Sequence, residues 1–422
     1  MAEKVVSPGV FTNEIDASFL PAAIGDIGAC IIGPTFKGPA LVPTVVNSMS
    51  EFEATFGTTF RSGSNYYQFL TSHAAEQYLS NGGPLTVVRV STATPATSTI
   101  FKVDSAGKFS QPYQSGSGNE SLTFETIGDG LIYNNHGGTG TSYDNIEDAE
   151  EGTNNVLTSG SNDNYRIEIT GVNNARGTFN VLVRSAGDTI KRKSVLETFN
   201  NVSLDPNSNN YIERIIGNQD MSIQGSGGTE PYVKPNGEFP NKSKFVRIKT
   251  VHSPTPNYLN ENGTRTDDNF TGSLPVAQSS SFIGGGAGVA GFDLFGGSHG
   301  SADVIPASFY DSIKSGNNQG LNTGDSTTLT AYEDAINLMA NADEYDINLM
   351  LLPGLNIEND SALINKAIDV CESRADAFLI ADPVNYGSSV STVNTKADSI
   401  DSNYAAVYWP WVQIQDARNN GA

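Results

Sequence analysis

The clearest pattern of hydrophobic and polar positions lies in the last third of the chain. Continuous apolar runs predict three buried strands, at 347–352, 377–380 and 405–412. Apolar residues at helical spacing predict three helices, at about 330–342, 361–374 and 390–400. The capping box Thr330-x-x-Glu333 marks the predicted start of the first helix. Strands that are apolar throughout and alternate with helices are typical of a parallel sheet covered on both faces.

The first quarter of the chain shows a similar arrangement. Apolar runs predict strands at 27–33, 41–46 and 85–90. A helix is predicted at about 65–79, because four apolar residues share one of its faces: Tyr67, Leu70, Ala74 and Tyr78. These elements are expected to form part of the same α/β core, which the following segment interrupts.

The middle of the chain is rich in Ser, Thr, Gly and Asn. Two runs of alternating polarity, 165–169 and 179–183, predict a hairpin. Further strands or a short helix are predicted at 195–199, 211–216 and 244–251. Residues 253–281 are expected to form a polar loop, and 284–300 a glycine-rich junction.

These changes of pattern divide the chain into five segments. They are a leading arm at 1–22, the first part of an α/β core at 23–91, an outer β-rich or loop insertion at 92–164, a second β-rich insertion at 165–283, and the main part of the core at 284–422. The predicted fold is therefore mixed α/β, with β-rich inserted domains and a parallel sheet flanked by helices.

The leading arm is too short and too weakly apolar to be stable alone. Pro8 and Gly9 favour an extended, bent backbone, and the anchoring residues would be Val6, Pro8, Val10 and Phe11. Its unpaired backbone groups need a sheet edge, on this chain or on a neighbouring copy. Self-assembly is therefore the first functional hypothesis, ahead of catalysis.

Composition narrows the possible partners and compartments. The 422 residues include 24 Lys and Arg against 46 Asp and Glu, a net charge of −22 that disfavours nucleic acids and anionic membranes. Cys30 and Cys371 stand among apolar residues and are predicted to be buried thiols. No run reaches the ~20 apolar residues of a membrane span, and no signal peptide is evident. We expect a soluble protein made in a cytoplasm.

Candidate catalytic and cofactor motifs are few. Gly286-x-Gly288-x-x-Gly291 matches a dinucleotide fingerprint as a string, but no clear strand precedes it and no helix follows. A subtilisin-like hydrolase would use Asp382, His299 and a serine, although neighbours such as Ser298 and His299 rarely form a nucleophile–base pair. No metal-binding spacing occurs among the four histidines, so neither a cofactor nor a metal is predicted.

Aromatic residues gather near the end of the chain, at Tyr404, Tyr408, Trp409 and Trp411. Core packing of a last sheet strand is the favoured interpretation. The alternative is an exposed contact surface around Trp409-Pro410-Trp411.

Seven groups of motifs, in order along the chain, resemble contractile tail sheath proteins of the myophage type and the related sheaths of contractile injection systems. They are Ser7-Pro8-Gly9-Val10-Phe11 with Glu14; Ile32-Gly33 with Lys37-Gly38-Pro39; Ser48 to Phe52 with Phe56-Gly57; Tyr78 to Gly83 with Val88-Arg89-Val90; Glu197 to Asp205 with Tyr211-Ile212; Asp346 to Gly354, then Cys371 to Arg374 with Ile380 to Pro383; and Ser402 to Asp416.

The resemblance implies a subtilisin-like core without protease activity, in a structural subunit of the virion tail made in the host cytoplasm. The expected partners are further copies in stacked six-fold rings, the tail tube, the baseplate and the tail terminator. The expected role is host entry, by contraction that leads to genome ejection. Family members continue beyond the position of Asp416 into a tube-facing domain that is expected to be absent from this chain.

A third class of function is also open. The Gly-, Asn-, Ser- and Thr-rich composition of residues 92–164 suits a surface adhesin or decoration module.

Overall fold

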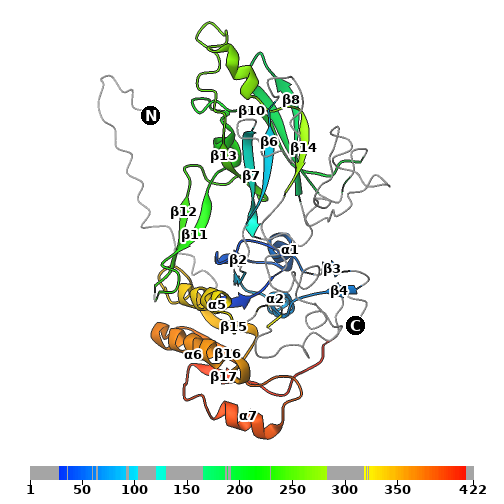
Figure 1. Cartoon of the computed structure of the whole chain (residues 1–422). Helices are drawn as coiled ribbons and strands as arrows, with labels where there is room; N and C mark the ends of the chain where they lie inside the picture. The colour runs from blue at the N-terminus through cyan, green and yellow to red at the C-terminus, as the bar shows by residue number, and fades with distance from the viewer. Residues whose placement is uncertain are drawn as a thin grey trace, which may run out of the picture.

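The structure is a computed structural model. It describes residues 28–35, 37–58, 60–62, 65–91, 95–102, 120–129, 165–185, 188, 192–228, 230–282, 318–319, 321 and 323–414. A layered α/β core and an elongated β-rich part are stacked end to end (Figure 1).

The α/β core is built on a six-stranded sheet of order β17-β16-β15-β1-β5-β2. Neighbouring strands are parallel except β2, which runs antiparallel to β5. The strands are β1 (Gly28–Gly33), β2 (Thr44–Val46), β5 (Leu85–Arg89), β15 (Ile347–Asn356), β16 (Phe378–Asp382) and β17 (Ala405–Val407). The predicted mixed α/β fold with a parallel sheet is confirmed at this level.

Helices cover both faces of this sheet. They are α1 (Met49–Phe56), α2 (Leu70–Ser80), α5 (Ser326–Leu338), α6 (Ile357–Arg374) and α7 (Val390–Ala397). Strand β1 is buried throughout, and its side chains alternate between two apolar clusters. Cys30 and Ile32 join the cluster of α5 and α6, whereas Ala29 and Ile31 join the cluster of α1 and α2. Both Cys30 and Cys371 are buried free thiols, as predicted.

Two predicted helix starts were wrong. Residues 65–67 form the strand β4 (Asn65–Tyr67), paired with β3 (Phe60–Ser62), so Tyr67 is not on the helix that begins at Leu70. Helix α5 begins before Thr330, because the Asp325 side chain accepts hydrogen bonds from the backbone N–H groups of the next turn. An aspartate cap one turn earlier takes precedence over the Thr-x-x-Glu pattern.

The β-rich part contains three antiparallel sheets, of orders β10-β9-β8-β14, β13-β7-β6 and β11-β12. Their strands are β6 (Pro95–Phe101), β7 (Glu120–Asp129), β8 (Tyr165–Asn173), β9 (Thr178–Ser185), β10 (Val195–Ser203), β11 (Asp220–Gln224), β12 (Tyr232–Asn236), β13 (Val246–Val251) and β14 (Gln278–Ser281). The predicted hairpin is β8–β9. Phe124, Ile167 and Val181 belong to a shared apolar core. The segment 253–281, predicted to be a loop, contains a 3-10 helix (Asp268–Ser273) and β14.

Residues 211–216 form the short helix α3 (Ile212–Ile216). Its residues Ile212 and Ile216 are fully buried in the apolar core of the β-rich part. The sequence predicted either a strand or a short helix at this position, and the structure contains the short helix.

A buried ion cluster stands on strands β8 and β9. Arg166 and Arg184, each 1% exposed, both pair with Asp188, and Arg184 also contacts Glu168 at 3.0 Å. The Asp188 carboxylate lies 2.8 Å from Arg184 Nε and also accepts the backbone N–H of Ser194. One carboxylate of the following loop therefore contacts two desolvated guanidinium groups.

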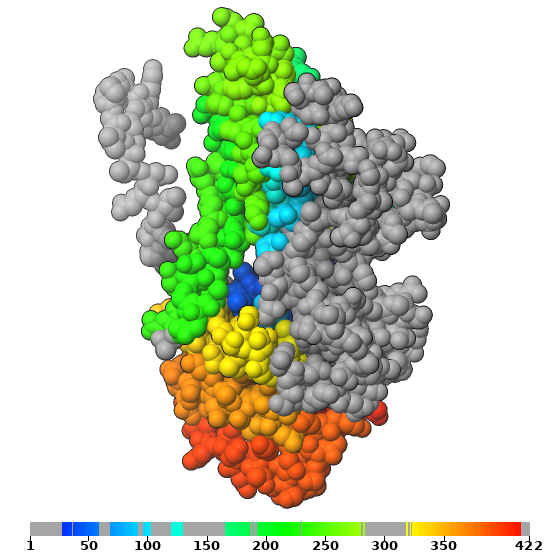
Figure 2. Space-filling model, viewed as in Figure 1, coloured from blue at the N-terminus to red at the C-terminus, as the bar shows by residue number. Residues whose placement is uncertain are grey.

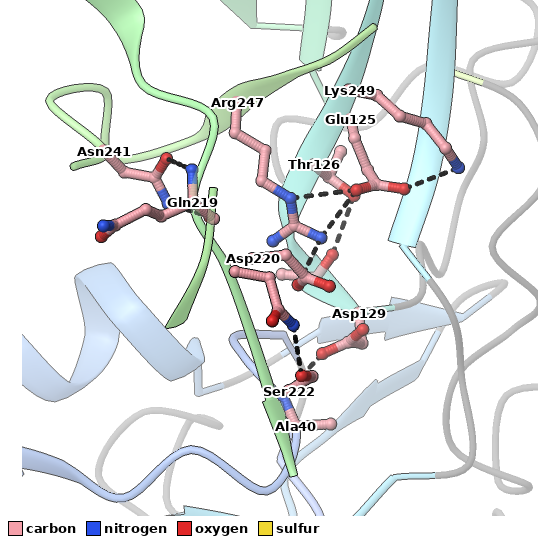
Figure 3. A network of polar contacts seen from close by, with 12 residues as sticks. Ala40, Glu125, Thr126, Asp129, Gln219, Asp220, Ser222, Asn241, Arg247 and Lys249 are labelled. Carbon is pink, nitrogen blue, oxygen red and sulfur yellow. Dashed lines mark hydrogen bonds and ion pairs between the residues drawn. The ribbon is translucent and has the colours of Figure 1, made fainter. Parts of the chain in front are cut away.

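Polar contacts also join the β-rich part to the α/β core. At the end of β7, Asp129 accepts the backbone N–H of Ala40 at 2.7 Å. The fully buried Arg89 donates to the carbonyl oxygens of Gly38 and Asp129. Higher on the same sheet, the Arg247 side chain bridges Glu125 and Asp220 (Figure 3). Charged side chains thus connect the base of the β-rich part to the α/β core.

Candidate assembly surface

The arm residues Val6, Pro8, Val10 and Phe11 lie outside the described residues. So do the glycine-rich string 286–291 and the Ser298–His299 pair. The hydrolase hypothesis, which combines Asp382 with His299, is therefore not tested by the described residues.

Asp382 ends β16 at the carboxyl edge of the parallel sheet, where ligands bind in many α/β proteins. Polar side chains near it bond to one another. Asn359 Nδ2 donates to Asn385 Oδ1 at 2.7 Å, and Ser388 Oγ donates to Glu358 Oε2 at 3.0 Å. Because these groups satisfy each other, they fix the loop that follows β16 and are not poised for chemistry.

Desolvation by the surrounding protein raises the pKa of Asp382 to about 6, although the residue is exposed by its surface area. The folded protein therefore holds this proton more tightly than the unfolded chain does. The contribution of Asp382 to the free energy of unfolding is therefore present at low pH and is lost as pH rises from about 4 through about 6.

We expect Asp382→Asn to become more stable than the parent protein as pH rises through this window, by about 1 kcal/mol or less because solvent screens a partly exposed group. Urea unfolding of both proteins between about pH 4 and about pH 7 measures the difference. Asp369→Asn, at an exposed position of α6, is the control. A difference in unfolding free energy between Asp382→Asn and the parent protein that stays constant across this pH range would contradict the raised pKa of Asp382.

Core packing of the last aromatic segment is confirmed for Tyr404, which packs against the apolar cluster of the core, and is wrong for Tyr408 and Trp409. The strand predicted at 405–412 ends at Val407. Tyr408 is 68% exposed and Trp409 is 43% exposed. Pro410 has no N–H group with which to continue a strand ladder. The alternative considered from the sequence, an exposed contact surface, agrees with this arrangement.

Large apolar side chains are exposed in α7, in the segment that precedes it and in the segment after β17, and we call this set the terminal apolar surface. Trp411 packs edge-on against Tyr386, with ring centroids 6.0 Å apart, and its indole N–H donates to the carbonyl oxygen of Val384. This contact anchors the segment while other large side chains remain exposed. The exposed members are Tyr386, Val390, Tyr408, Trp409, Val412 and Ile414.

A short edge strand lies directly before this surface. Strand β17 pairs with β16 on one side, with Ala406 opposite Ile380. Within the described part of the chain, no strand pairs with its other side. An edge strand with a free row of backbone groups can accept a further strand.

Other kinds of site find no support in the described residues. There, no group of His, Cys, Asp and Glu side chains has the arrangement needed to hold a metal ion. No helix among these residues has both the length and the apolar character needed to cross a membrane.

No protein-family model matches the chain, and no curated protein matches it. Solved structures do match it, and these include the following two. One, from Desulfitobacterium hafniense, has 11% identity and a TM-score of 0.39, over 98% of this chain and 58% of that one. The other, from Listeria innocua, has 10% identity and a TM-score of 0.39, over 85% of this chain and 48% of that one.

Both are sheath tail proteins. This chain spans about half the length of the sheath tail proteins that it matches, 58% of one and 48% of the other.

Proposed function

We propose that this chain is a structural subunit of a contractile tail sheath. The observation that carries the proposal is the terminal apolar surface beside the edge strand β17. Several large apolar side chains exposed near one edge strand on an acidic protein are typical of a contact with another protein. The ordered motifs from Ser7 to Asp416 support the same assignment.

In this proposal, identical copies repeat head to tail in stacked six-fold rings around a tail tube. Contacts between two different surfaces of the same protein, when they do not close, produce a helical array. The leading arm, through Val6, Pro8, Val10 and Phe11, adds a strand to a sheet edge of a neighbouring copy. These links keep the copies connected while the folded bodies rotate and slide during contraction.

Contraction supplies the work that drives the tube through the host envelope. The extended array is the metastable state and the contracted array is the state of lower free energy, so small gains per copy add up along the sheath. The further partners are the tube, baseplate and tail terminator proteins, and the location is the virion tail after synthesis in the host cytoplasm. A phage-derived injection system would use the same subunit in the same way.

The fold proposed for the core is of subtilisin-like topology without protease activity. The chain order proposed is an arm at 1–22, core segments at 23–91 and 284–422, and β-rich insertions at 92–164 and 165–283. In the described residues, β1, β5, β15 and β16 lie in one sheet, which is what this division of the core requires.

Electron microscopy of the purified full-length gene product tests the proposed function. We expect striated tubes or polysheaths of regular width. A product that remains monomeric at every concentration and salt condition, with the tube protein present or absent, would overturn it.

The terminal apolar surface can be tested separately. We expect the double substitution Tyr408→Ser and Val412→Ser to leave the unfolding midpoint unchanged, because both side chains are exposed in the single subunit. Assembly should fall about tenfold or more, because two anchors of one contact are removed.

Sedimentation measures the assembled fraction of this variant. The matched control is Val195→Ser with Leu196→Ser, two exposed apolar residues of β10 in the β-rich part. Equal assembly of the two double variants would remove the terminal apolar surface from the proposal.

A further inference from the structure

The hairpin β11–β12 reaches from the β-rich part to a helix of the α/β core. Its strands pair only with each other, from Asp220 opposite Asn236 to Gln224 opposite Tyr232. Figure 1 shows it extending from the base of the β-rich part toward α5, and Figure 2 shows its surface meeting that of the core. A two-stranded hairpin is only marginally stable by itself, so its position depends on contacts at its two ends.

The tip of the hairpin binds to α5 through three hydrogen bonds. Ser226 Oγ donates to Asp334 Oδ2 at 2.6 Å, and the backbone N–H of Gly227 donates to Asp334 Oδ1 at 2.8 Å. Asn337 Nδ2 donates to the carbonyl oxygen of Gly228 at 3.0 Å. Asp334 and Asn337 are three residues apart on α5 and therefore share one helix face.

The part of the hairpin next to the tip adds an apolar contact. Ile223 and Val233 stand opposite each other across the two strands, and both pack against the apolar cluster of the α/β core. Cross-strand partners project from the same face of a hairpin. One face of the hairpin therefore contacts the core near the tip.

The other end of the hairpin belongs to the β-rich part. Asp220, the first residue of β11, pairs with Arg247 of β13 at 2.8 Å. The amide of Asn241 bonds in both directions with the backbone of Gln219 (Figure 3). The hairpin thus spans the boundary between two bodies that are otherwise joined at Asp129 and Ala40.

The chemistry at the tip makes this connection reversible. Asp334 is 1% exposed, and within the described residues no cation pairs with it. Its charge is stabilised by one hydroxyl and one backbone N–H of the hairpin, and by water once the hairpin leaves. Replacing these two hydrogen bonds of Asp334 with hydrogen bonds to water changes the free energy little. Loss of a buried ion pair, by contrast, costs several kcal/mol.

We propose that the β11–β12 hairpin is a releasable strap that fixes the orientation of the β-rich part on the α/β core. While Ser226 to Gly228 are bound to Asp334 and Asn337, the two bodies move as one. When the tip leaves α5, the β-rich part pivots about the junction at Asp129. This strap is a property of the single subunit and does not depend on the proposed sheath function.

Distances between paired spin labels test the strap in the full chain. Labels on Glu261→Cys, an exposed position of the β-rich part, and Asn365→Cys, an exposed position of α6, report the relative orientation of the two bodies. The natural cysteines are fully buried and do not compete for the label. We expect a narrow distance distribution in the parent protein and one about twice as wide in Asp334→Ala.

Hydrogen exchange supplies a second readout. The amides of β11 and β12 should exchange about tenfold faster or more in Asp334→Ala, because local opening no longer breaks the bonds at the tip. Glu333→Gln is the matched control, because it removes one negative charge from the neighbouring position of α5. It should leave both the distance distribution and the exchange rates as in the parent protein.

A third variant keeps the test decisive if Asp334→Ala does not fold. Ser226→Ala with Asn337→Ala removes two of the three tip bonds, and retains the carboxylate with its backbone donor. Faster exchange and a wider distribution in this variant support the strap. A parent-like distribution and parent-like exchange in every folded variant would overturn the proposal.

Discussion

Removal of residues 1–14 is expected to abolish assembly and leave a folded monomer. The deleted segment contains Val6, Pro8, Val10 and Phe11, which are proposed to pair with a sheet edge of a neighbouring copy. The described core begins at Gly28 in β1, beyond the deletion, so its sheet retains all its strands. Size-exclusion chromatography with light scattering should find the truncated protein entirely at monomer mass, while the full-length chain sediments as polymer.

Two observations separate this result from simple unfolding. The circular dichroism spectrum and the unfolding midpoint of the truncated protein should match those of full-length chains held as monomers. Val10→Asp with Phe11→Asp, in a chain of unchanged length, should reproduce the loss, because charged residues at these positions oppose burial of the arm. Polymers of normal helical symmetry from the truncated protein would refute the role of the arm.

Asp188→Ala is expected to cause the largest loss of stability of any single substitution considered. It removes the carboxylate that contacts both buried arginines, Arg166 and Arg184, and leaves the contact of Arg184 with Glu168. Removal of one partner from a buried ion cluster costs about 3–5 kcal/mol, because buried charges lose part of their compensation. Urea unfolding, followed through the β-sheet signal, measures the change in the free energy of unfolding of the β-rich part.

The contrast with an exposed pair sharpens this prediction. Asp268 contacts Arg265 at 3.2 Å, but the Asp268 side chain is 92% exposed. Asp268→Ala should therefore cost about 1 kcal/mol or less. Equal losses for Asp188→Ala and Asp268→Ala would show that burial does not set the strength of the Asp188 cluster.

The α/β core could be predicted well from the sequence, and its element boundaries less well. The runs at 27–33 and 347–352 are apolar at every or nearly every position, and 85–90 at most positions, which is typical of a strand covered on both faces. Starts of elements depend on single side chains. The Asp325 cap set the start of α5, and local pairing of β3 with β4 displaced the start of α2.

The terminal apolar surface shows a different kind of failure. Tyr408, Trp409 and Val412 have the composition of a buried strand, and hydrophobicity alone cannot tell a core from a contact surface. Pro410 between two tryptophans was the available signal, since proline cannot continue a strand ladder. The strap had no comparable signal, because Asp334 and Asn337 look like ordinary polar positions of a helix.

The sequence by itself determined which segments of the described chain must be covered by protein, because apolar periodicity follows from the geometry of each helix or strand. It also carried the ordered motifs that indicate a sheath subunit. The partner of each buried group became known from the folded arrangement alone: β1 lies between β5 and β15, Asp188 joins two buried arginines, and a distant hairpin covers Asp334. The sheet order and the contact at Asp334 join residues far apart in the chain, and a local pattern indicates burial without indicating the partner.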